Sequence, residues 1–113
     1  MAKQTTRKLK SVNRKIDGKL PPQAIELEEA VLGALMLDNE ALSDTIDILK
    51  PEYFYKMEHQ KIFDAIIILF NESKPVDILT IIEQLKKSGE LESIGGAFYI
   101  TQLTNNVASS ANT

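Results

Sequence analysis

An apolar segment that directly follows two prolines places the strongest constraint on the fold of this chain. Pro21 and Pro22 suit the start of a helix, because a first helical position does not need its backbone N–H. The run Ala30–Leu37 is apolar on nearly every side and predicts a helix over about 22–37 at the centre of a core. Gly33 is a weak helix former within this run, which indicates that another backbone comes close there.

Polar residues at both ends of this segment support the helix. Glu26, Glu28 and Glu29 stand in its first turns, where carboxylates interact favourably with the positive end of the helix dipole. Asp38 or Asn39 ends the segment and is suited to cap a following helix.

Four further short helices are predicted, each with apolar residues at helical spacing. Pro51 ends the first of these, because the residue before a proline resists the α conformation. Asp77 is the expected N-cap of the third, and Gly89 is its expected C-terminal cap. No strand pattern is convincing, so we predict an all-α fold, a compact bundle of about five short helices. The predicted ranges are about 40–49, 58–71, 78–87 and 97–104.

Three features of the sequence could belong to a binding or catalytic site, but each is better explained by a role in packing or in a turn. The aromatic cluster in Pro51–Tyr55 predicts a one-turn connector that buries its rings. A platform for stacking nucleic-acid bases would require basic residues around the rings, and only Lys56 lies beside them. Gly95 and Gly96 lack the strand and the Lys-Ser/Thr of a phosphate-binding loop. His59 is expected to be packed or hydrogen-bonded. The chain has no cysteine and no second histidine, so we predict no catalytic, cofactor-binding or metal-binding residue.

Charge is distributed unevenly along the chain. Seven of the 13 basic residues and one of the 16 acidic residues lie in residues 1–20, which gives +6 there and −9 over 21–113. We interpret 1–20 as a flexible, disordered basic leader, in preference to a nucleic-acid-binding arm, because it lacks an aromatic residue for base stacking. Neither a secretory signal nor a membrane-spanning run is apparent, so a cytoplasmic location is predicted.

The end of the chain predicts a truncated domain. Residues 105–113 are small and polar, and Ser109, Ser110 or Asn112 are suited to cap a helix that the chain does not contain. The domain is therefore expected to cover 21–113 and to stop before its last helices. The apolar faces of the predicted helices are too wide for one partner each, which predicts at least a weak dimer.

Four segments stand out along the chain: AVLGALMLD (Ala30–Asp38), FYKMEHQKIF (Phe54–Phe63), VDILT (Val76–Thr80) and IGGAF (Ile94–Phe98). In this order and spacing they resemble one family, the N-terminal domain of replicative DNA helicases of the DnaB type, over about residues 20–113.

The resemblance implies a division of labour. Such helicases are hexameric rings of two-domain subunits that unwind duplex DNA at the replication fork. A RecA-like C-terminal domain binds and hydrolyses ATP with magnesium, while the helical N-terminal domain supports ring assembly and receives primase within the primosome. A helicase loader is a further implied partner, and DNA is bound by the complete ring. The ATPase domain and the family's helical hairpin are missing from this sequence, so the resemblance implies no cofactor for this chain.

Two other functions remain as alternatives. A small helical DNA-binding regulator would need Arg, Lys, Asn or Gln on an exposed recognition helix, whereas the predicted helices carry mainly acids and a few lysines. A small enzyme would need a polar constellation that the sequence does not show. We therefore predict an assembly and docking domain of a replicative helicase.

Overall fold

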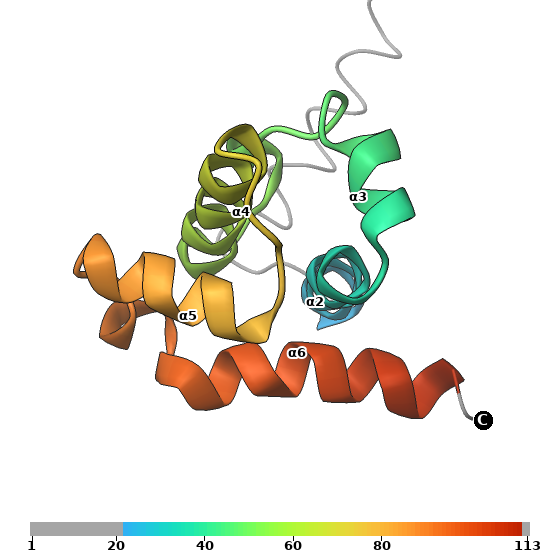
Figure 1. Ribbon diagram of the computed structural model, residues 1–113. Helices are drawn as coiled ribbons and strands as arrows, with labels where there is room; N and C mark the ends of the chain where they lie inside the picture. Colours follow the sequence, from blue (N-terminus) through green and yellow to red (C-terminus); the bar gives the residue numbers. More distant parts are fainter. Residues whose placement is uncertain (1–21, 112–113) are drawn as a thin grey trace, which may run out of the picture.

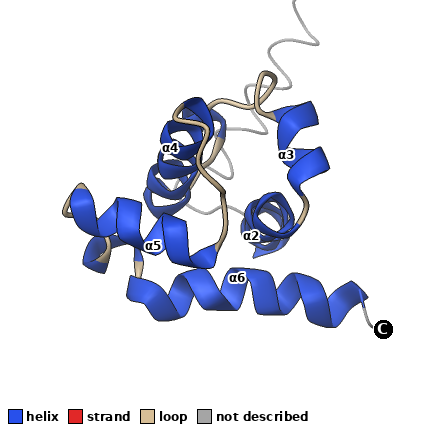
Figure 2. Ribbon diagram, in the orientation of Figure 1, coloured by secondary structure: helices blue, strands red, loops and turns tan. Residues whose placement is uncertain are grey.

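The computed structural model describes residues 22–111, which form α-helices and 3-10 turns without any strand (Figure 2). The predicted all-α fold is confirmed. The predicted leader (1–20) and the proposed cap Asn112 lie outside the described residues. No helix within 22–111 is long and apolar enough to cross a membrane. The elements are α2 (Pro22–Leu37), α3 (Asn39–Thr45), η1 (Pro51–Tyr53), α4 (Met57–Asn71), α5 (Ile78–Lys87), η2 (Glu92–Ile94) and α6 (Gly96–Ala111).

Helix α2 occupies the middle of the bundle. In Figure 1 it is seen end-on, with α3 on one side, α4 across from it and α6 running beneath it. The contact between α2 and α6 is the most extensive one between any two of these elements. Helix α4 packs against α2, α5 and both 3-10 turns, and α5 also lies against α6. The central position predicted for this helix is therefore confirmed.

Gly33 is the point at which α2 and α6 cross most closely. A Cβ atom placed on Gly33 would stand 2.7 Å from Cγ2 of Val107 and would collide with the backbone carbonyl oxygen of Leu103. The carbonyl belongs to the helix backbone and has little freedom to move. Only glycine fits here, as the sequence indicated.

The core is formed by one cluster that draws on every helix. Its members are nearly or completely inaccessible to water, and burial of such side chains is the main favourable term in folding. Helix α2 is not buried on every side, however, because Leu37 is 54% exposed. The largest fully buried apolar side chains are Leu32, Ile62, Phe63, Ile66, Ile81, Leu85, Ile94, Ile100 and Leu103.

The predicted helix caps are present. Asp38 accepts hydrogen bonds from the backbone N–H groups of Glu40 and Ala41 at the start of α3. Asp77 forms a reciprocal capping box with Thr80 at the start of α5. Gly89, beyond the end of α5, has a positive φ of 76°, a conformation that glycine adopts without steric cost.

Two predicted helix ends were wrong. Helix α3 ends at Thr45 and not near residue 49, and in the turn that follows the N–H groups of Ile48 and Leu49 both donate to the carbonyl of Thr45. Helix α6 continues to Ala111 and not to about residue 104, so Ser109 and Ser110 lie inside a helix and do not cap another. Its polar second half has weak helix propensity, but the contact with α2 extends the helix, since tertiary packing overrides propensity.

The aromatic connector was predicted correctly in shape and only partly in burial. Residues 51–53 form the single turn η1, and Phe54 after it is buried. Tyr53 and Tyr55 are each more than half exposed, so two of the three rings do not join the core.

The crossing of α2 and α6 generates a first prediction. Gly33→Ala improves helix propensity by about 1 kcal/mol, yet it drives a methyl group into the Leu103 carbonyl. We expect the substitution to lower the free energy of unfolding by about 1–3 kcal/mol, as overpacking does. Urea unfolding followed by circular dichroism measures this. Asn105→Ala, at an exposed position of α6, is the control and should leave stability unchanged or slightly raised. A Gly33→Ala chain as stable as that control would contradict the account.

Candidate functional site

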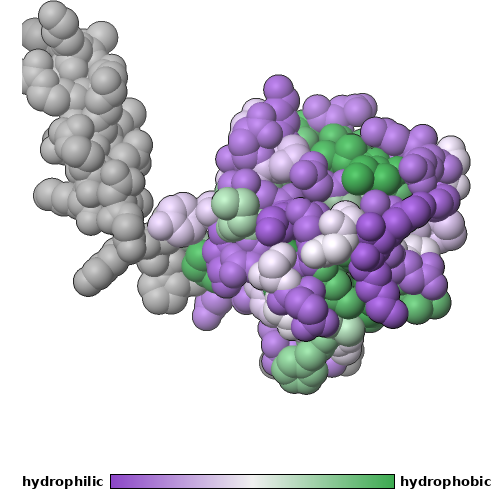
Figure 3. Space-filling model, turned by 90° about the vertical axis from the view of Figure 1, so that its left-hand side faces the viewer, coloured by the Kyte–Doolittle hydropathy of each residue, from purple (hydrophilic) through white to green (hydrophobic). Residues whose placement is uncertain are grey.

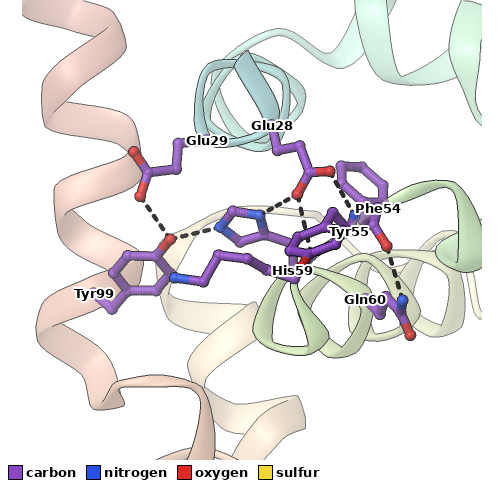
Figure 4. Close-up of polar contacts among 8 residues, drawn as sticks. Glu28, Glu29, Phe54, Tyr55, His59, Gln60 and Tyr99 are labelled. Atoms are coloured by element: carbon purple, nitrogen blue, oxygen red, sulfur yellow. Dashed lines mark hydrogen bonds and ion pairs between the residues drawn. The ribbon is translucent and has the colours of Figure 1, made fainter. Parts of the chain in front are cut away.

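Four polar side chains form a continuous hydrogen-bonded chain through the interior, which we call the polar network: Glu28, His59, Tyr99 and Glu29. Nδ1 of His59 lies 2.7 Å from Oε1 of Glu28, and its Nε2 lies 2.6 Å from the hydroxyl oxygen of Tyr99. The Tyr99 hydroxyl also lies 2.8 Å from Oε2 of Glu29. Figure 4 shows the imidazole between Glu28 and Tyr99, with side chains from three helices meeting.

The helical spacing of the sequence places these groups on core-facing stripes. Glu28 precedes Leu32 and Leu35 on one side of α2, and both leucines are buried. His59 precedes Ile62 and Phe63 on α4 in the same way and is itself completely buried. A polar residue in register with buried apolar residues must find a hydrogen-bond partner. Every buried side-chain nitrogen or oxygen in the described region has one.

Glu28 also holds the start of α4. Its carboxylate accepts a hydrogen bond of 2.6 Å from the backbone N–H of Tyr55 and lies 3.5 Å from the N–H of Lys56. Lys56 is the N-cap position of α4 and supplies no side-chain cap of its own. A carboxylate from α2 therefore stands at the positive end of the α4 dipole, where negative charge is stabilised.

The role predicted for the glutamates of α2 needs correction. No acidic residue lies in the first turn of α2. Glu28 and Glu29 are instead used in tertiary hydrogen bonds to α4 and α6. Sequence reasoning missed this pairing, because the partners are far apart along the chain. The available signal was the position of Glu28 on the stripe of buried leucines.

Tyr99 lies in an environment that opposes its ionisation. Burial, the hydrogen bond to Glu29 and the negative charges of Glu29, Glu58 and Glu28 all raise the pKa of the Tyr99 hydroxyl above its ordinary value of 10.0. The ammonium of Lys56 lies 5.8 Å from the centre of the Tyr99 ring, within the range of a cation–π contact. The hydroxyl is therefore held in its neutral form.

This arrangement ties helices together and offers no free reactive group. Both ring nitrogens of His59 are engaged, which confirms the prediction of a packed, hydrogen-bonded histidine. Within residues 22–111 no three His, Cys, Asp or Glu side chains gather as a metal-binding group. The absence of catalytic and cofactor-binding residues stays a prediction.

The outer surface has a second notable feature, a set of exposed apolar side chains. Figure 3 shows hydrophobic areas separated by a largely hydrophilic surface. A groove between α2 and α6 is lined by Ala30, Ala34 and Val107, with Glu26, Glu29 and Asn106 also lining it. The large exposed apolar residues are Leu27, Leu37, Ile48, Tyr53, Tyr55, Met57, Ile68, Leu79 and Phe98.

The polar network generates a prediction about alkaline pH. Tyr99 should stay protonated in the folded chain to a higher pH than a tyrosine in an unfolded chain, whose pKa is about 10. Since unfolding lowers the pKa of Tyr99 back to about 10, the free energy of unfolding should be constant with respect to this group below pH 10 and fall above it. Absorbance at 295 nm and urea unfolding measure both effects, and Tyr99→Phe should lose both. A Tyr99 hydroxyl that ionises at the same pH in the folded chain as in the urea-unfolded chain would refute the prediction.

Comparison with known proteins places the chain in a family. Residues 20–113 match the family described as DnaB-like helicase N terminal domain. The chain is 50% identical over 95 residues to the replicative DNA helicase DnaB of Rhodothermus marinus, covering 84% of this chain and 10% of that protein. It is 42% identical over 97 residues to the replicative DNA helicase DnaC of Bacillus subtilis (strain 168), covering 86% of this chain and 21% of that protein.

A solved structure shares the fold. The crystal structure of the N-terminal domain of DnaB helicase from Mycobacterium tuberculosis superposes with a TM-score of 0.74 at 38% sequence identity, over 82% of this chain and 66% of that one. The chain spans only 10–21% of the length of these two helicase relatives. The helical arrangement around α2 and the match over residues 20–113 lead to one conclusion: this chain belongs to the family of DnaB-like helicase N-terminal domains.

Proposed function

We propose that this chain is the assembly and docking domain of a hexameric replicative DNA helicase. The observation that carries the proposal is the family match over residues 20–113, together with relatives named as replicative DNA helicases. In this proposal the chain supports ring assembly and receives primase. ATP-driven unwinding, with magnesium, belongs to a further part of the parent protein, and a helicase loader is a further candidate partner.

The use of polar groups in the interior supports this role. The four side chains of the polar network are hydrogen-bonded to one another and join α2, α4 and α6. Because these polar groups bind one another, they make the domain rigid. A rigid head suits a domain that holds neighbouring subunits and partners in register, because little ordering entropy is lost on binding.

The outer surface supports protein partners over nucleic acid. Exposed apolar side chains occur on α2, after α3, on α5 and on α6, at Leu37, Ile48, Leu79 and Phe98. Exposed apolar area is typical of surfaces that bind other proteins. Residues 21–113 also carry a net charge of −9, which would repel the phosphate backbone of DNA. The charge therefore argues against the alternative of a DNA-binding regulator.

Two binding measurements test the proposal on the 113-residue chain. Sedimentation equilibrium should show self-association that grows with concentration. Calorimetric titration with the helical C-terminal domain of primase should show weak binding, which strengthens when the chain is lengthened by the residues that follow it in its parent protein. A fluorescence titration with duplex DNA at moderate salt should show no binding.

Surface variants locate the interface. Leu37→Ser, Ile48→Ser, Leu79→Ser and Phe98→Ser each remove one exposed apolar group without touching the core. At least one should weaken self-association several-fold at unchanged stability, whereas the control Glu52→Ser, at an exposed polar position, should not. A chain that stays monomeric at high concentration and fails to bind primase in either length would overturn the proposal. Tight, salt-dependent DNA binding would favour the regulator instead.

A further inference from the structure

The polar network contains three hydrogen bonds and therefore needs three hydrogens. Those bonds join Glu28 to His59, His59 to Tyr99, and Tyr99 to Glu29, at 2.7, 2.6 and 2.8 Å. A neutral imidazole contributes one N–H and the tyrosine contributes one O–H, while an ionised carboxylate contributes none. With a neutral histidine and two ionised glutamates, the network is one hydrogen short.

Each way of placing two hydrogens leaves one contact without a proton. If Tyr99 donates to Glu29 and Nδ1 of His59 donates to Glu28, then Nε2 and the tyrosine oxygen face each other as two acceptors 2.6 Å apart. If Tyr99 donates to Nε2 instead, its oxygen faces the ionised Glu29 at 2.8 Å with no hydrogen between them. If Nε2 donates to the tyrosine oxygen and Tyr99 donates to Glu29, then Nδ1 and the Glu28 carboxylate face each other as two acceptors 2.7 Å apart. An acceptor without a donor is costly to the extent that it has lost water, and His59 is completely buried while Tyr99 and Glu29 are part-buried.

We propose that the polar network binds one additional proton in the folded chain and thereby makes the fastening of α2 to α4 and α6 dependent on pH. The proton completes the third hydrogen bond, as an imidazolium at His59 or as a protonated carboxyl at Glu28 or Glu29. Glu29 also lines the groove between α2 and α6, so the proton is held where these two helices meet.

Charged groups from α2 and from the start of α4 lie around His59 and Tyr99. Glu28 and Glu29 approach from α2, and Glu58 lies beside His59 on α4 and acts on the same tyrosine. Lys56 is the opposing cation and lies over the Tyr99 ring. Three carboxylates and one ammonium therefore surround the contact between the imidazole and the Tyr99 hydroxyl.

Titratable groups in or next to the two 3-10 turns packed against α4 influence a different residue of that helix. Glu52 in η1 and Glu90 before η2 act on Asp64, further along α4. There burial, followed by the charges of Glu90 and Glu52, raises the pKa of the Asp64 carboxyl above 3.8. Tyr99 keeps its own proton up to alkaline pH, because its pKa is raised above 10.0.

The sign of the pH dependence follows from proton counting. Unfolded histidine and glutamate have released the additional proton above about pH 6.5, while the folded network retains it. The folded state then binds more protons than the unfolded state, so the free energy of unfolding falls as pH rises. While the folded network keeps its proton, the unfolding equilibrium constant rises about tenfold per pH unit.

Glu29→Gln separates this proposal from a purely structural role. The glutamine amide donates its own hydrogen to the Tyr99 oxygen, Tyr99 then donates to Nε2, and Nδ1 donates to Glu28. All three bonds are satisfied with a neutral histidine and no additional proton. Glu26→Gln is the matched control, because it removes the same charge from an exposed position of α2 outside the polar network.

The experiment is urea unfolding of the complete 113-residue chain and the two variants at pH 7, 8 and 9. We expect the unfolding constant of the unmodified chain and of Glu26→Gln to rise toward tenfold per pH unit. That of Glu29→Gln should change less than twofold across the whole range. An unmodified chain whose unfolding constant is flat from pH 7 to 9 would overturn the proposal, even if a variant failed to fold. The same pH slope in Glu29→Gln as in the unmodified chain would also overturn it.

Discussion

The close crossing of α2 and α6 at Gly33 is the constraint on which the rest of the structure depends. With no side chain at Gly33, the backbone of α6 comes within contact distance of α2 at Leu103, and the side chain of Val107 packs beside it. This approach lets Leu32 and Leu103 bury completely and brings the first half of α6 over α2 and α5. Close packing of this kind has few alternatives of similar energy, since interiors leave little free volume.

The polar network fastens the other end of α2 and depends on the same crossing. Tyr99 lies one helical turn before Leu103 on α6, so the hydroxyl reaches Glu29 only when α6 lies against α2. Glu28, next to Glu29, then holds His59 and the backbone of Tyr55 at the start of α4. Apolar packing sets the position of α2, and the polar network sets its register against the two neighbouring helices.

Much of this fold could be predicted from the sequence, because its strongest signals are local. Each of these signals depends only on a few neighbouring residues. The apolar spacing, the helix start at Pro22 and the caps Asp38 and Asp77 were predicted correctly. The ends of α3 and α6 were wrong, because tertiary packing decides them. The hydrogen-bond partners of His59 lie on other helices, so local sequence patterns could not identify them. A helical plot that flagged polar groups on buried stripes would have identified Glu28 and His59 as partners in need of hydrogen bonds.

Native-state amide hydrogen exchange tests the central claim, that α2 and α6 form one cooperative unit. If the crossing at Gly33 holds both helices, amides in the middle turns of α2, such as Leu35, and of α6, such as Leu103, should open with the same free energy. That free energy should approach the one for global unfolding. The account would be contradicted if the Leu103 amide exchanged through a local opening at markedly lower free energy while the Leu35 amide stayed protected.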